Sequence, residues 1–374
     1  MKKLLLATPL LACACASPTP STTAETVLDS SQVQPRTIDW NADSLIASDE
    51  KHFAHLRQLT FGGNNAEAYW NFSGDQLSFQ SDFADWGNSC DQIYSIDPFT
   101  SDVRKNPPTR LSTNGGRTTC SFFLPGDSLV LFASTASGGK ECPHTVGHTP
   151  GGKYLWNVYK EYDIYISDLD GNIRGQLTNE LGYDAEATVS PKRDRIVFTS
   201  MRDGDLDLYT MNIDGSDVKR ITNMIGYDGG AFFSPDGSQL VWRASRPKTA
   251  EETKEYVDLL KEGLVQPTSM ELWVANADGS NARQITNLGK ANWAPNWTAD
   301  GKRIIFATNH TTERGFPFTL YLINADGTGL EKVTHEDAFD AFPMFNSDGR
   351  YLVFSSNRGG KNRETNLFLA EWKD

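Results

Sequence analysis

Residues 176–191 read QLTNELGYDAEATVSP, and residues 220–235 read RITNMIGYDGGAFFSP. Their Leu-Thr or Ile-Thr pair, their Gly-Tyr-Asp triplet and their Ser-Pro pair are all displaced by 44 residues. A fixed period of this size indicates a repeat architecture. Within one period, residues 195–200 and 207–212 are rich in β-branched and aromatic residues and are bounded by Asp, Gly, Pro and Ser. Each period is therefore predicted to form a small antiparallel sheet.

The Leu-Thr signature recurs along the whole chain, at Leu59-Thr60, Leu111-Ser112, Leu177-Thr178, Ile221-Thr222, Ile285-Thr286 and Val333-Thr334. Six units with four strands each predict an all-β fold, a six-bladed β-propeller of four-stranded antiparallel blades. A signature pair precedes the first unit, and residues 366–372 form a last strand without a successor. We therefore expect an N-terminal strand to complete the final blade and close the ring.

The N-terminal residues have the composition of an export signal. Residues 1–12 join a basic start to a short apolar run, which predicts a signal peptide. Residues 10–13, Leu-Leu-Ala-Cys, resemble a bacterial lipobox, so Cys13 is the candidate for lipidation; an ordinary cleaved signal is the alternative. No Asp follows Cys13, which predicts a lipid-anchored protein on the periplasmic side of the outer membrane. Residues 13–50 are rich in Ser, Thr and Pro and are predicted to be a flexible tether, with the propeller spanning 51–374.

The charge of the chain limits the classes of partner. The formal net charge is −13, which argues against binding the phosphate backbone of a nucleic acid or an anionic lipid surface. Membrane attachment is therefore expected only through the N-terminal anchor, and the propeller is expected to be a monomer. Cations, metal ions and neutral glycans stay open as ligands.

The surplus residues between repeats are predicted to form loops on one face. Five of the six blades carry an insertion between their second and third strands, at residues 82–90, 135–162, 246–269, 310–318 and 357–365. Long loops on a rigid scaffold are where binding usually occurs. The blade 4 insertion contains a capping box from Thr249 to Glu252, which predicts a helix that either acts as a lid or covers apolar surface.

Acidic and amide side chains recur where the innermost strands are expected to enter the central channel. Counting back six residues from the turn of each repeat gives Glu67, Thr118, Asp184, Asp228, Asn292 and Asp340. Carboxylates that converge on one axis repel each other unless a cation neutralises them. The channel mouth is therefore a candidate site for Ca²⁺, Mg²⁺ or a cationic group, with Asp184, Asp228 and Asp340 as metal ligands. The alternative is that these residues only cap strands and bind loop backbone.

Three of the five cysteines lie in the predicted propeller. Cys90, Cys120 and Cys142 are all predicted to lie on the face with the insertions. An oxidising compartment favours pairing two of them. We expect a disulfide between Cys120 and Cys142, which would hold the longest loop to its own blade.

The Ser-Pro-Asp-Gly turn at 234–237, the Asn-x-Asp-Gly turns and the Leu-Thr strands together resemble the WD40-like repeats of TolB-type propellers over about residues 51–374. The resemblance implies a periplasmic propeller that binds a protein of the cell envelope. TolB carries an α/β domain ahead of its propeller, whereas only the predicted tether precedes residue 51 here. Similar blades also occur in prolyl oligopeptidase relatives and in polysaccharide lyases. No Gly-x-Ser-x-Gly elbow is present, which excludes the serine hydrolase class.

These observations favour a binding or scaffold protein over an enzyme. No nucleophile with a base and an orienting group can be assembled from the sequence. The leading hypothesis is an envelope-anchored propeller that recognises a periplasmic protein or a cell-wall glycan through its loop-bearing face. The alternative is a metal-assisted polysaccharide lyase or hydrolase with its site at the channel mouth and a histidine of the rim as base.

Overall fold

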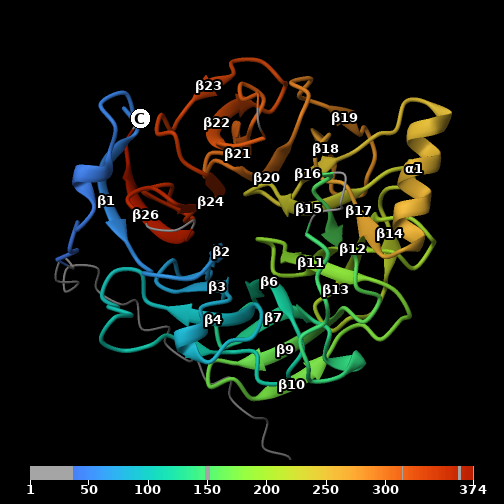
Figure 1. The fold of residues 1–374 in the computed structure, drawn as a ribbon, viewed down its shortest axis with the longest axis horizontal. Coiled ribbons are helices and arrows are strands. Elements are labelled where there is room, and N and C mark those ends of the chain that lie inside the picture. Colours follow the sequence, from blue (N-terminus) through green and yellow to red (C-terminus); the bar gives the residue numbers. More distant parts are fainter. Residues whose placement is uncertain (1–36, 148–151, 314, 361–363, 374) are drawn as a thin grey trace, which may run out of the picture. The chain divides into compact units, whose positions relative to one another are not determined.

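The computed structural model describes residues 37–147, 152–313, 315–360 and 364–373. In these ranges, six four-stranded antiparallel sheets surround a common axis (Figure 1). The six-bladed all-β propeller predicted from the repeats is confirmed.

Blades 1 to 3 follow each other along the chain, and in each of them the first strand is innermost. Blade 1 contains β2 (Asn65–Trp70), β3 (Leu77–Ser81), β4 (Gln92–Ile96) and β5 (Thr109–Arg110). Blade 2 contains β6 (Thr118–Phe123), β7 (Leu129–Ser134), β9 (Asp163–Asp168) and β10 (Ile173–Gln176). Blade 3 contains β11 (Asp184–Val189), β12 (Arg195–Ser200), β13 (Asp207–Asn212) and β14 (Lys219–Arg220).

Blades 4 to 6 complete the ring, and the last one takes its outer strand from the N-terminal side of the chain. Blade 4 contains β15 (Asp228–Phe233), β16 (Gln239–Ala244), β18 (Glu271–Asn276) and β19 (Arg283–Gln284). Blade 5 contains β20 (Asn292–Trp297), β21 (Arg303–Thr308), β22 (Thr319–Asn324) and β23 (Glu331–Lys332). Blade 6 contains β24 (Asp340–Phe345), β25 (Tyr351–Ser356), β26 (Asn366–Trp372) and β1 (Phe53–Gln58). The pairing of β1 with β26 confirms the expected closure.

The second strand of each blade is buried on both sides because neighbouring blades pack against it. In β12, Ile196, Val197 and Phe198 have no exposed surface. A short continuous run of β-branched and aromatic residues is typical of such a strand. The turn that precedes it in blade 4 contains Gly237 with φ of +67°, a left-handed conformation that favours glycine.

The insertion of blade 4 carries helix α1 (Ala250–Lys261), at the rim of the ring (Figure 1). Its capping box is present: Thr249 Oγ1 accepts from the backbone N–H of Glu252, and the Glu252 carboxylate accepts from the backbone N–H of Thr249. Tyr256 and Leu260 are buried, and the Tyr256 hydroxyl donates to Asp205 of blade 3. The helix therefore covers apolar surface, and the strand after it, β17 (Leu264–Val265), pairs with β8 (Trp156–Asn157) of the blade 2 insertion.

The predicted tether is too long at its C-terminal end. The compact unit begins at Ile38, and residues 38–50 pack on blade 6 instead of remaining free. The short 3₁₀ helix Asp43–Leu45 precedes β1, and Glu50 is buried in an ion pair of 2.9 Å with Arg358. The composition of residues 38–50 did not predict this packing, because a few anchoring side chains are enough to order a segment that is otherwise polar.

The predictions for the signal peptide, for Cys13 and for most of the tether fall on residues 1–36, outside the described residues. No helix in the described part of the chain has the length and apolar character needed to cross a membrane.

Candidate functional site

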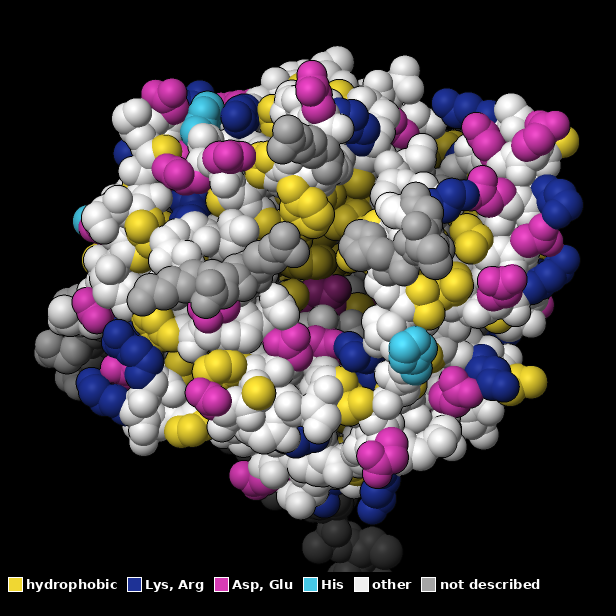
Figure 2. Space-filling view, in the orientation of Figure 1, with side chains coloured by type: hydrophobic (Ala, Val, Ile, Leu, Met, Phe, Trp, Pro, Cys, Tyr) yellow, Lys and Arg dark blue, Asp and Glu magenta, His cyan; other side chains and the backbone are white. Residues whose placement is uncertain are grey.

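The hub of the propeller encloses a cavity of about 880 Å³. The inner strands form its walls, and side chains from four insertions line it as well: Trp156, Val265, Phe316 and Asn357. Figure 2 shows a hollow at the centre of this face, with hydrophobic side chains gathered on one side of it and acidic side chains within it. The volume is in the range of small-molecule sites, roughly 300–1,000 Å³.

Five of the six predicted site residues begin an inner strand. Thr118, Asp184, Asp228, Asn292 and Asp340 are the first residues of β6, β11, β15, β20 and β24, and all five are buried. Of these five, only Thr118 lines the cavity. They form what we call the outer ring, whose sixth member is Asn65 at the start of β2.

Glu67 does not belong to the outer ring. In blade 1 the count of six residues started from Ser73, but the residue that starts the equivalent turn is Asn71. The backbone N–H of Asn71 donates to the carbonyl of Gln76, just as the backbone N–H of Ser190 in blade 3 donates to the carbonyl of Arg195. Glu67 therefore lies two residues further along its strand than the other five.

The carboxylates of the outer ring are held by arginines. Asp184, Asp228 and Asp340 form ion pairs with Arg202, Arg246 and Arg358, each 18 residues later in its own blade, at 3.0, 2.5 and 3.0 Å. Burial is the main cause that raises the pKa of Asp228 to about 6, against the lowering effect of Arg246.

The two uncharged members bind backbone. Thr118 Oγ1 donates to the carbonyl of Asp91 at 3.0 Å, and Asn292 Nδ2 donates to the carbonyl of Met270 at 2.8 Å. Within the described ranges, no group of three or more His, Cys, Asp or Glu side chains could hold a metal ion. The arrangement therefore favours the alternative, in which the outer ring anchors strands, over a site with Asp184, Asp228 and Asp340 as joint metal ligands.

A second ring lies two residues further into the inner strands. Its members share a left-handed backbone, with φ between 48° and 61°, and all line the cavity: Glu67, Cys120, Glu186, Gly230, Ala294 and Phe342. In each strand the pairing register shifts between the second and fifth residues, which is a β-bulge. The bulge turns the third side chain toward the axis. We call this set the inner ring.

Sequence reasoning missed five of the six inner-ring residues. A strand without a bulge alternates its side chains, and the bulge breaks that alternation at the third position. The available signal was the Gly229-Gly230 pair of blade 4, since glycine inside a strand pattern suggests a bulge.

Two ion pairs occupy the polar side of the cavity. Arg117 pairs with Asp91, and Arg243 pairs with Glu186. The Tyr227 hydroxyl donates to Glu186 Oε1 at 2.8 Å, and the backbone N–H of Gly230 donates to Glu186 Oε2 at 3.0 Å. The Glu186 carboxylate is therefore fully satisfied.

Glu67 has a different environment. No arginine, lysine or histidine pairs with it among the described residues, and its Oε2 atom is shielded from water without a hydrogen-bond partner. Burial raises the pKa of Glu67 to about 7; a hydrogen bond with Cys120 opposes the shift, and the charge of Glu186 adds to it. The group therefore titrates near neutral pH.

Aromatic side chains form the remaining walls. The rings of Trp156 and Trp293 lie 5.1 Å apart, and those of Phe316 and Phe339 lie 5.8 Å apart. The Arg243 guanidinium lies over the faces of Trp156 and Tyr227, at 5.2 and 5.1 Å from the ring centres. Trp156 reaches this place because β8 and β17 form a two-stranded ribbon.

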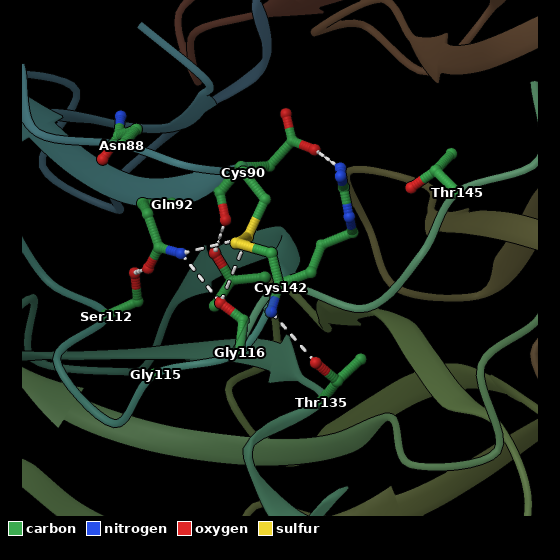
Figure 3. Close-up of a disulfide and its surroundings, with 12 residues drawn as sticks. Asn88, Cys90, Gln92, Ser112, Gly115, Gly116, Thr135, Cys142 and Thr145 are labelled. Atoms are coloured by element: carbon green, nitrogen blue, oxygen red, sulfur yellow. Dashed lines mark hydrogen bonds and ion pairs between the residues drawn. A yellow bond between two sulfur atoms is a disulfide. The ribbon is translucent and has the colours of Figure 1, made fainter. Parts of the chain in front are cut away.

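The predicted disulfide is wrong. Cys142 bonds to Cys90 of blade 1 (Figure 3). Cys120 is a free, buried thiol. Cys120 occupies the inner ring, where its thiol is hydrogen-bonded to Glu67. The bond therefore fastens the blade 2 insertion to the neighbouring blade, beside Gln92, whose Nε2 donates to the carbonyl of Gly116 at 2.8 Å.

Comparison with solved structures gives the same architecture at low identity. A protein assigned as TolB in Agrobacterium tumefaciens matches with a TM-score of 0.52 and 17% identity, over 83% of this chain and 91% of that chain. TolB from Acinetobacter baumannii matches with a TM-score of 0.50 and 16% identity, over 84% of this chain and 66% of that chain. At these identities the likeness shows the fold alone.

A curated relative is similar over a short stretch. Dipeptidyl-peptidase 5 of Porphyromonas gingivalis is 51% identical over 39 residues, which is 10% of this chain and 6% of that protein.

The family comparison covers more of the chain. The model described as PD40, the TolB beta propeller domain, matches residues 148–261 and 265–365, which is more than half of the sequence. Together with the six-bladed fold, this match shows that the protein belongs to the TolB β-propeller domain family.

Proposed function

We propose that this protein is a recognition propeller that holds a polypeptide segment of an envelope partner in its hub cavity. The observation that carries the proposal is the cavity itself, which is lined by two satisfied ion pairs, an unpaired carboxylate and a wall of aromatic rings. Rigid aromatic side chains beside a few placed polar groups are typical of binding sites. The TolB-like fold agrees with a binding or scaffold role.

The surroundings of the cavity support a binding role. Its mouth lies among insertions that are anchored to the ring: the disulfide holds the blade 2 insertion, and β8 pairs with β17 across two insertions. Anchored loops lose less conformational entropy when a ligand binds.

The location belongs to the same proposal. The signal-like N-terminus and the lipobox-like Cys13 support a lipid-anchored protein on the periplasmic side of the outer membrane. The disulfide agrees with an oxidising compartment.

The metal-assisted lyase or hydrolase is less well supported. It requires Asp184, Asp228 and Asp340 to share an ion, whereas each of them pairs with an arginine of its own blade. We therefore propose binding without catalysis.

Site-specific photo-crosslinking in the cell of origin tests the proposal. A photoreactive phenylalanine analogue replaces Phe342, which lines the cavity, and in a control it replaces Ala282, exposed in the turn between β18 and β19. That turn lies at the end of the blade opposite to the insertions, because the strands alternate in direction. We expect a discrete adduct from position 342 and none from position 282.

Digestion identifies the partner. If a protease removes the added mass of the adduct, the partner is a polypeptide, as proposed. If a muramidase removes it, the partner is a cell-wall glycan and the proposed polypeptide is wrong. Equal adducts at both positions, or none at either, would overturn a binding role for the cavity.

A further inference from the structure

The charges in the cavity do not balance. The described lining contains five side chains of the Asp, Glu, Lys and Arg types: Glu67, Asp91, Arg117, Glu186 and Arg243. Asp91 with Arg117 and Glu186 with Arg243 form two neutral pairs. Glu67 remains, so the described lining carries one negative charge when Glu67 is ionised.

The unpaired oxygen of Glu67 differs from the other buried carboxylate oxygens without partners. Asp228 and Asp340 each have one such oxygen, but an arginine binds the other oxygen of both. Among the described residues, Glu67 forms a hydrogen bond with Cys120 and no ion pair with an arginine. An ionised carboxylate held in this way is costly unless a partner is supplied from outside the chain.

Titratable groups from several strands around the hub act on the Glu67 carboxylate. They are Tyr69 on its own strand β2, Asp91 before β4, Cys120 on β6, Glu186 on β11 and Arg243 on β16. Burial is the largest cause of its raised pKa, Cys120 and Arg243 lower the pKa, and Glu186 and Asp91 raise it. Because Arg243 is already paired with Glu186 and Arg117 with Asp91, an added cation would stabilise the ionised form of Glu67.

Another part of the lining is apolar. Trp293, Phe339 and Phe342 belong to it. Behind them, Phe318 stacks on Trp293 with ring centres 4.3 Å apart and contacts Phe339. Phe316 is 60% exposed at the mouth. Figure 2 shows hydrophobic side chains on one side of the hollow and acidic ones deeper within it. A ligand that satisfies both parts has a positive charge next to an apolar group.

We infer that the cavity binds a primary ammonium group carried on an apolar body, with the Glu67 carboxylate as its acceptor and the aromatic wall as the seat of the apolar part. This inference rests on the proposed binding function and narrows its ligand. One free carboxylate among aromatic rings suits an organic cation, since an alkaline-earth ion takes six or more oxygen ligands. The net charge of −13 also favours the approach of a cation.

Two sources carry this chemistry: the amino terminus of a peptide whose first side chain is apolar, and a free arylalkylamine. The full chain is titrated calorimetrically with 2-phenylethylamine, with its neutral isostere 2-phenylethanol, and with phenylalanyl-alanyl-alanine amide before and after N-acetylation. The two variants are Glu67→Gln and the control Glu336→Gln, which removes an exposed acid from the loop between β23 and β24. Thermal melting confirms that both are folded.

We expect the amine to bind about ten- to hundredfold more tightly than the alcohol at about pH 8, the range of a hydrogen bond to a charged group. The preference should disappear in Glu67→Gln and persist in Glu336→Gln. Between about pH 8 and about pH 5.5 the amine keeps its proton while Glu67 gains one, so the affinity of the wild type should fall by more than about tenfold. Tight binding of the free peptide amide alone, abolished by acetylation, would identify a peptide terminus as the source.

Equal binding of amine and alcohol, or a preference that survives in Glu67→Gln, would overturn the inference. If no probe binds while the crosslink at position 342 forms, the ammonium assignment is wrong and the recognition function stands. If neither is observed, both proposals fall.

Discussion

The outer and inner rings consist of equivalent residues on the same six strands, two positions apart, and they differ in how their charges are satisfied. In the outer ring, Asp184, Asp228 and Asp340 each meet an arginine from their own blade. In the inner ring, Glu186 has an arginine and Glu67 has none. Since the two sets lie two residues apart on each strand, an error of two residues in register exchanges a residue that anchors a strand for one that lines the cavity.

The contrast shows that buried acids are weak evidence for a site until their partners are known. The outer ring has more carboxylates than the inner ring, yet each of these carboxylates forms an ion pair with an arginine of its own blade. The inner ring has fewer acids and is the ring that lines the cavity.

The largest expected loss of stability comes from removing the arginine that pairs with Asp340, the outer-ring residue of blade 6. Arg358 is 2% exposed in its side chain and pairs with both Glu50 and Asp340. Arg358→Leu leaves two buried carboxylates unpaired and should lower the free energy of unfolding by about 3–5 kcal/mol. Urea denaturation measures the loss. Arg350→Leu on the same blade, which breaks an exposed pair with Glu371, should cost less than about 1 kcal/mol; similar losses for both would contradict an anchoring role.

The next effect concerns the bond that holds the insertion over the cavity. Reduction of Cys90–Cys142 should lower the free energy of unfolding by about 2–4 kcal/mol, because the two residues close a loop of 52 residues. Thermal melting with and without reductant measures this loss. A Cys90→Ser, Cys142→Ser double variant should not respond to reductant, and a wild type that is equally unresponsive would show that the bond does not stabilise the fold.

Replacement of the inner-ring acid should stabilise the protein, with a defined pH dependence. The pKa of Glu67 is about 7 in the folded chain against 4.5 ordinarily, so the folded state binds more protons between these values and the wild type loses stability as the pH rises through them. The Glu67→Gln variant avoids this loss of stability because the Gln side chain does not ionise. Its advantage should be absent below about pH 4.5 and reach up to about 3 kcal/mol above about pH 7.

Urea denaturation at several pH values checks this prediction. The Glu336→Gln control should show no such dependence. A Glu67→Gln variant that is less stable than the wild type at about pH 8 would mean that the carboxylate has a partner in the free protein.

The smallest effect on stability is expected at the mouth. Phe316 is 60% exposed, so Phe316→Ser should change the free energy of unfolding by less than about 0.5 kcal/mol. It should nevertheless weaken binding of 2-phenylethylamine, because the apolar part of the ligand loses a neighbour. Leu181→Ser, at a side chain that is 84% exposed and outside the cavity lining, should leave that affinity unchanged; equal losses in both variants would remove Phe316 from the binding surface.

The repeat in the sequence was sufficient to predict the six-bladed propeller. Leu-Thr pairs, Asp-Gly turns and runs such as 195–200 are local patterns, and each of blades 1 to 5 is built from strands that follow each other along the chain. The capping box at Thr249 is a local pattern as well. The closing strand β1 was predictable because a signature pair precedes the first unit and the last strand has no successor. The family follows from these repeats as well.

The site required the tertiary structure. Whether Asp184 meets a ligand or Arg202, whether Cys142 bonds to Cys120 or Cys90, and whether residue 67 faces a strand or the axis all depend on a bulge and on packing between blades. A bulge shifts one strand against its neighbour without altering the hydrophobic pattern. The sequence by itself therefore determined the blades and their order, and only the packed ring decided which side chains reach the hub, because that choice is made by contacts between residues far apart in the chain.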